Sequence, residues 1–153
     1  MVLNPQLVDP TFYIASFAGG AFGAAIGALP AFIFTGFMVI AGQATASLGL
    51  DGAGEGASLT ASGFTGYLGF GPVFGPHISF AAGAAAAAYA AKKGYIDDGK
   101  NILWAAGTNN LDVLLVGGIF GILGLVGTGL GRTVGIPTDN IALMVFVSAL
   151  IHR

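Results

Sequence analysis

The residues best placed to do chemistry lie in the stretch 69–80, GFGPVFGPHISF, where helix-breaking residues precede a histidine and a serine. Proline has no backbone N–H and interrupts a helix, so a chain broken twice in this way leaves backbone groups unpaired. At membrane depth such a break is tolerated only inside protein or against water. We therefore predict a solute path or gate made by the following residues: Gly71, Pro72, Phe74, Gly75, Pro76, His77 and Ser79.

The helix expected after this break supports the prediction. Residues 77–91 are mostly alanine, the best helix former, and two lysines and a glycine follow, as helix C-termini prefer. The N-terminus of this helix would direct free N–H groups and its positive dipole end at the break, where an anion or a solute oxygen could bind. His77 would hydrogen-bond, titrate or gate there. The alternative is an ordered extracellular loop before an ordinary helix.

Two apolar stretches carry glycine at every fourth position: Gly19, Gly23 and Gly27 in the first, Gly117 and Gly121 in the second. Such strips let helix backbones approach closely, which drives helix association in lipid. We expect them to pack helices within one chain or between copies. A narrow conduit lined by backbone is the alternative. Both stretches contain GGxFG, which suggests two related halves.

Asp112 lies two residues into an apolar stretch and is expected at the membrane interface, either capping the helix or facing nearby lysines. A proton relay is the alternative role for this carboxylate. The sequence contains no nucleophile, base and orienting residue at supporting positions, no phosphate-binding motif and no cysteine. We therefore predict a protein that is not an enzyme and that uses no cofactor and no metal.

The composition indicates the solvent in which these residues work. Only 8% of residues are charged and 55% are hydrophobic, whereas soluble domains carry about 25% charged residues. Such a chain cannot cover a surface in water. A net charge of -2 without a basic stripe gives no reason to expect nucleic acid as a partner. We predict that residues 1–153 form a single integral domain of the plasma membrane, with the lipid bilayer as its main partner.

Four apolar stretches supply the expected segments. No charged residue occurs in 11–47, which is longer than the roughly 20 residues needed to cross a bilayer. It forms one tilted helix or two shorter ones, with a break favoured at Pro30. Residues 63–91 contain the broken or re-entrant part at 69–77, 111–131 is the clearest span, and 141–151 is short. The prediction is an all-α, polytopic membrane bundle of four to five segments.

Basic residues set the expected orientation. Three of the five, Lys92, Lys93 and Lys100, share the loop 92–107, which the positive-inside rule places in the cytoplasm. A short interfacial helix anchored by Tyr95 and Trp104 is expected in this loop. The linker 48–62 then lies outside, and the N-terminus lies inside if residues 11–47 cross once and outside if they form a hairpin.

The segments AFGAAIGALPAFIFTGF, GFGPVFGPHISFAAGAAAAAYAAKKG and LLVGGIFGILG make the chain resemble a small, uncharacterised Gly/Ala-rich prokaryotic membrane protein family best represented in haloarchaea. The resemblance covers most of the chain, and GPH and GGxFG are its motifs. It implies a membrane protein with a helical fold, and it implies no particular activity.

A chain of this size has little surface with which to enclose a water-filled path, so we expect a homo-oligomer. Our leading hypothesis is a small homo-oligomeric channel or transporter for a small solute or ion, with residues 69–80 at its path. The alternative is a non-catalytic membrane scaffold or accessory subunit that packs through its glycine strips. A path requires residues 69–80 to face a hydrated cavity, whereas a scaffold leaves them dry or exposed.

Overall fold

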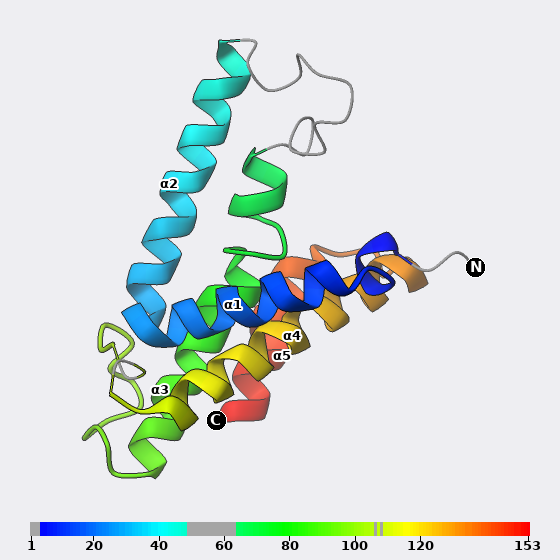
Figure 1. The fold of residues 1–153 in the computed structure, drawn as a ribbon. Coiled ribbons are helices and arrows are strands. Elements are labelled where there is room, and N and C mark those ends of the chain that lie inside the picture. The colour runs from blue at the N-terminus through cyan, green and yellow to red at the C-terminus, as the bar shows by residue number, and fades with distance from the viewer. Residues whose placement is uncertain (1–3, 49–63, 106, 108) are drawn as a thin grey trace.

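The computed structural model describes residues 4–48, 64–105, 107 and 109–153, and every regular element in this part of the chain is helical (Figure 1). This confirms the all-helical fold class. The elements in chain order are η1 (Pro5–Leu7), α1 (Pro10–Ile26), α2 (Ala28–Ser47), η2 (Thr65–Gly69), η3 (Pro76–Phe80), α3 (Ala81–Lys92), α4 (Leu111–Val134) and α5 (Asn140–His152). Two of them, α2 and α4, are long and apolar enough to span a membrane.

The long apolar stretch forms two helices, and the break between them lies at Gly27 rather than at Pro30. Gly27 has φ +98° and ψ 150°, a conformation that side-chain-bearing residues rarely adopt. A Cβ at this position would also lie 2.9 Å from the carbonyl oxygen of Leu103. Pro30 instead occupies the first turn of α2, where a missing N–H removes no intrahelical hydrogen bond. The expectation of a break at Pro30 was therefore wrong by three residues.

The loop before α4 pairs the backbone groups that this break leaves open. The Leu29 N–H donates to the Ile102 carbonyl at 3.0 Å, and the Gly107 N–H donates to the Ala24 carbonyl at 2.9 Å. The end of α1 and the start of α2 are thus both bonded to a segment about 75 residues further along the chain. The direction in which α2 leaves α1 depends on this loop.

α1 and α4 pack along their glycine-rich faces and lie side by side in Figure 1. A Cβ at Gly20 would meet the Gly117 carbonyl and would lie 2.9 Å from the Gly121 Cα atom. A Cβ at Gly117 would lie 2.6 Å from the Ala24 Cβ atom. The two GGxFG stretches are therefore in direct contact with each other within one chain.

The chain breaks between η2 and η3, in agreement with the prediction for residues 69–77. Residues 70–75 form the turn between these two wide-turn helices, and η3 runs directly into α3. The alanine-rich helix begins at Pro76, one residue before the predicted start, and extends to Lys92. Proline fits the first turn of a helix, which explains why the helix can begin there.

α2 stands away from the other long helices and is accompanied along its upper half by η2 (Figure 1). Several of its large apolar side chains are exposed, including Phe37 at 59% and Ile40 at 68%. A Cβ at Gly36 would meet no atom within 4 Å. One face of α2 is therefore left uncovered by the described residues.

The remaining helix boundaries follow local chemistry. α4 continues past Arg132 to Val134, because a cation is favourable in the last turn of a helix, and it ends at Gly135 with φ +75°. α5 begins beside Asp139, whose carboxylate accepts the Ile141 N–H at 2.8 Å. The short interfacial helix expected in the loop before α4 is wrong for the described residues, which form turns there.

Gly20→Ala should destabilise the protein by roughly 1–3 kcal/mol, because the added methyl group collides with α4. Gly36→Ala is the matched control on an open helix face, and it should stabilise the protein by roughly 0.5–1 kcal/mol. Thermal unfolding in detergent would measure both changes. Equal melting temperatures for the two variants would contradict the described α1 and α4 contact.

Candidate functional site

The broken segment lies in the interior of the chain, where η3 contacts α1, α2 and α4. Pro76, His77, Ile78 and Ser79 are all buried, and His77 is only 3% exposed. Pro72 in the preceding turn is also fully buried. The segment is therefore part of the core rather than an exposed loop.

Hydroxyl groups from distant helices pair the carbonyls of the break. Ser16 Oγ on α1 donates to the Pro72 carbonyl at 2.8 Å. The Phe74 carbonyl accepts from the Thr35 hydroxyl on α2 and from Ser79 Oγ, the latter at 3.0 Å. The expectation that these backbone groups remain unpaired was wrong, because the sequence does not reveal which remote hydroxyls reach them.

Two of the amides at the start of η3, those of Ile78 and Ser79, are also paired. The Gly75 carbonyl accepts from the Ile78 N–H at 2.8 Å and from the Ser79 N–H at 2.9 Å, while the Gly75 N–H donates to the Gly71 carbonyl at 3.1 Å. The predicted free N–H groups of Ile78 and Ser79 are therefore not available to a solute in this conformation. The Phe74 ring closes the turn against Phe22 of α1 and Phe34 of α2, with ring centroids 5.1 and 4.8 Å away.

The glycine strips receive the carbonyl groups of the broken segment. The Cβ position of Gly19 points at the Val73 carbonyl, and that of Gly23 points at the Ser79 carbonyl. Gly124 on α4 meets the His77 carbonyl in the same way. Backbone carbonyl oxygens packed directly against glycine Cα atoms make weak C–H···O contacts. The strips thus accommodate a third piece of backbone between α1 and α4.

This arrangement changes where self-association can occur. Gly23 and Gly121 are buried within one chain, and the Cβ position of Gly121 points at the Ser16 carbonyl. A second copy has no access to either residue. Of the two arrangements expected for the glycine strips, Gly23 and Gly121 therefore show packing within one chain, and bulky residues there would first disrupt the single chain.

His77 keeps one polar atom without a partner. Its Nδ1 atom is buried and makes no hydrogen bond within the described chain. The ring lies directly over Gly75, whose Cβ would be 2.8 Å from Nδ1. A buried polar atom left unpaired costs about 1–3 kcal/mol, so it calls for an explanation in strain, water or function. The hydrogen bonds of the backbone around the break do not explain why the Nδ1 atom of His77 has no partner.

Asp112 lies in the first turn of α4 and joins three parts of the chain. Its carboxylate accepts from the hydroxyl of Tyr89 on α3 at 3.1 Å and from that of Tyr95 in the following loop at 3.2 Å. Its negative charge is the main reason why the pKa of Tyr95 is raised. Lys93 Nζ lies 5.4 Å from the centre of the Tyr89 ring. Asp112 therefore faces the lysine-bearing loop and holds the ends of α3 and α4 together.

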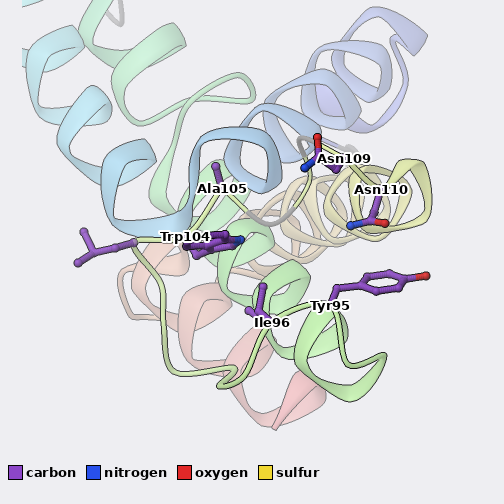
Figure 2. Close-up of a pocket in the computed structure, with 7 residues that line it drawn as sticks. Tyr95, Ile96, Trp104, Ala105, Asn109 and Asn110 are labelled. Carbon is purple, nitrogen blue, oxygen red and sulfur yellow. The ribbon is translucent and has the colours of Figure 1, made fainter.

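The loop before α4 forms a pocket that sequence reasoning missed (Figure 2). Its volume is about 240 Å³, and its lining residues are Tyr95, Ile96, Leu103, Trp104, Ala105, Asn109 and Asn110. In the sequence, the adjacent Asn109 and Asn110 follow Trp104 by a few residues, and this pattern could have indicated the pocket. That signal was interpreted only as a membrane-interface anchor.

A second hollow, an apolar groove of about 380 Å³, runs between the broken segment and α5. Pro76, Phe70 and Phe80 form one wall, and Ile141 and Val145 form the other. Of the residues predicted for the solute path, Pro76 borders this groove. The other predicted path residues are buried in the core, except Phe74, which is partly exposed.

The fold and the sites together define a glycine-rich, all-helical protein with two membrane-length helices and a buried break. The chain belongs to DUF7973, a family of unknown function whose model matches residues 2–153. This confirms the resemblance to an uncharacterised family. Comparison with curated proteins and with solved structures gives no match.

Ser16→Ala should lower the free energy of unfolding by about 1–3 kcal/mol, because it leaves the buried Pro72 carbonyl without a donor. Ser47→Ala is the control, since its hydroxyl bonds the Gln43 carbonyl on an exposed turn of α2 and its loss should change stability by less than about 0.5 kcal/mol. Denaturant titration in detergent compares the two. An unaffected Ser16→Ala variant would mean that this hydrogen bond does not hold the break.

Proposed function

We propose that this protein is a multi-pass plasma membrane protein of four to five segments that conducts or transports a small solute or ion, with residues 69–80 as the moving element at its path. The membrane assignment is supported by the two membrane-length helices and by the low content of charged residues. Exposed apolar side chains on α2 are consistent with contact with lipid or with a further copy of the chain. The loop 92–107 is cytoplasmic in this proposal.

The observation that carries the transport proposal is the unpaired Nδ1 atom of His77 at a break in the core. Broken helices in membrane transporters place their solute sites at such points. A hydrogen-bonding solute passing the break would supply the partner that this nitrogen lacks. In this proposal, the free-energy cost of the unpaired Nδ1 atom is present only in the conformation without solute.

The contacts around the break suit a segment that moves. Val73, Ser79 and His77 present carbonyl groups to glycines rather than interlocking side chains. Smooth backbone contacts of this kind can shear by small steps, as packed helices do in closing motions. Residues 71–79 are packed closed, so a path opens in this proposal by displacement of η3 against α1 and α4.

Self-association in this proposal uses the arm made by α2 and η2. Its exposed face includes Ile33, Phe37 and Ile40, whereas the glycine strips face inward. A homo-oligomer joined by these arms would cover the apolar surface that one chain leaves open. It would also leave the broken segment of each copy intact.

A scaffold or accessory subunit is the second candidate, and one observation favours it. The carbonyls of Pro72, Phe74 and Gly75 all have hydrogen-bond donors within the protein. These three groups of the break therefore need no solute as a partner. In a scaffold, the break serves only to turn the chain. Flux measurements distinguish this function from transport.

The orientation of the chain in the membrane is tested by cysteine labelling. The wild-type chain contains no cysteine, so only an introduced cysteine in it can react. Lys93→Cys should resist an impermeant thiol reagent added outside intact cells, since the cationic loop resists translocation. It should react after permeabilisation, because Lys93 is exposed. Gly54→Cys, which lies outside the described residues, should react in intact cells. Equal labelling of the two variants in intact cells would contradict the proposed orientation.

The transport proposal is tested by flux into vesicles containing the purified protein, with water, glycerol, urea, alkali cations and chloride as probes. His77→Ala should change the flux of the conducted probe by about fivefold or more, because a hydrogen bond at the path is lost. His152→Ala is the matched control, since the chain has two histidines and the Nδ1 atom of His152 is also unpaired.

One result would reject transport, and a second would reject the role of His77 in it. Wild-type vesicles without flux of any probe would leave the scaffold function. A His77→Ala variant that keeps the wild-type flux while folded and oligomeric would remove this residue from the path. Circular dichroism and native mass spectrometry provide the folding and assembly controls.

A further inference from the structure

The pocket beside Trp104 has the composition of a binding site, and it is separate from the broken segment. It is built by the loop between α3 and α4 together with the residues just before α4. Figure 2 shows the indole ring of Trp104 with its nitrogen on the side of Tyr95 and Asn110. The amide of Asn109 lies above the same hollow.

Several hydrogen-bonding groups in this pocket lack a protein partner. The side chains of Asn109 and Asn110 and the indole N–H of Trp104 make no hydrogen bond to another described residue. Asn110 occupies the N-cap position of α4, yet its side chain does not bond the helix. Each amide offers two donors and an acceptor, and the indole offers one donor. Asn109 and Trp104 are exposed, so these groups are open to a ligand with several hydroxyl or amide groups.

The electrostatics of the pocket favour a neutral ligand. None of the lining side chains carries a charge at neutral pH. The Asp112 carboxylate beside Tyr95 accepts hydrogen bonds from Tyr89 and Tyr95, and Lys93 lies over the Tyr89 ring. An ion placed among uncharged amides would lose water without gaining a counter-charge, which is costly.

The size and walls of the pocket narrow the ligand further. A volume of about 240 Å³ is below the range of about 300–1,000 Å³ that is typical of drug-sized ligands and cofactors. Ile96, Leu103 and the aromatic ring of Trp104 supply apolar surface to the pocket. A single sugar or cyclic polyol ring combines an apolar C–H face with a rim of hydroxyl groups.

We propose that this pocket binds a neutral, hydroxyl-rich molecule of about monosaccharide size, with its ring against Trp104 and its hydroxyl groups on Asn109 and Asn110. The same loop fixes the break between α1 and α2, because the Leu103 carbonyl lies against Gly27 and the Ile102 carbonyl holds α2. A bound ligand therefore also stabilises the start of α2. The proposal does not depend on transport by the broken segment.

The experiment uses Trp104, the chain's single tryptophan, as a reporter located in the pocket. Purified protein in detergent is titrated with glucose and with myo-inositol while Trp104 emission is recorded. We expect a saturable change with at least one of these probes and a rise in melting temperature at saturation. Choline chloride and sodium phosphate, as charged probes small enough to enter the pocket, should give no saturable change.

Asn109→Ala and Asn110→Ala should each weaken the response about fivefold or more, the effect of one lost hydrogen bond. Asn101→Ala is the matched control, because Asn101 is an asparagine of the same loop that lines the adjacent hollow instead. Melting temperatures without ligand verify that all three variants fold. If Asn110→Ala unfolds, Asn109→Ala alone decides the result.

Three outcomes would overturn the proposal. Absence of a saturable response to both glucose and myo-inositol would reject a sugar or polyol site. A response to choline or phosphate instead would reject a neutral ligand. A sugar response that Asn109→Ala and Asn110→Ala leave unchanged would place binding elsewhere.

Discussion

The structure depends on one constraint, which is that the backbone of a buried break must find partners in a chain with few polar side chains. Ser16 and Thr35 supply hydroxyl groups to the carbonyls of Pro72 and Phe74. Unpaired, each of these carbonyls would cost about as much as a lost buried hydrogen bond. The positions of α1 and α2 relative to the break follow from these contacts, since a hydroxyl reaches a carbonyl only at close range.

Glycine solves the packing problem that accompanies this pairing. A turn and a helix start placed between α1 and α4 need room that ordinary side chains would occupy. Gly19, Gly23 and Gly124 leave that room, and carbonyl oxygens fill it. Because interiors are packed to crystal-like density, a methyl group at any of these positions displaces backbone rather than a flexible side chain. Glycine at these three positions therefore reflects backbone contact within one chain.

The two breaks in the chain lead to different kinds of chemistry. At the break before η3, protein groups satisfy the carbonyls of Pro72 and Phe74 and leave one buried imidazole nitrogen of His77 unpaired. At Gly27, the loop before α4 satisfies the backbone and leaves the asparagine amides beside Trp104 directed into an open pocket. The first arrangement suits a moving element in transport, and the second suits recognition of a solute that hydrogen-bonds from water.

The sequence by itself determined the helical class, the break around residues 69–77, the alanine-rich helix after it and the start of α5 beside Asp139. These features depend on local chemistry, because proline removes a donor, alanine favours helix and a carboxylate caps the residues that follow it. Only the tertiary structure decided that Gly27 rather than Pro30 separates α1 from α2, since a loop about 75 residues away supplies its partners. It likewise decided that Ser16 pairs Pro72 across 56 residues, and that Trp104 and Asn110 share a pocket. Such pairings depend on how helices meet in space, which the order of residues along the chain does not record.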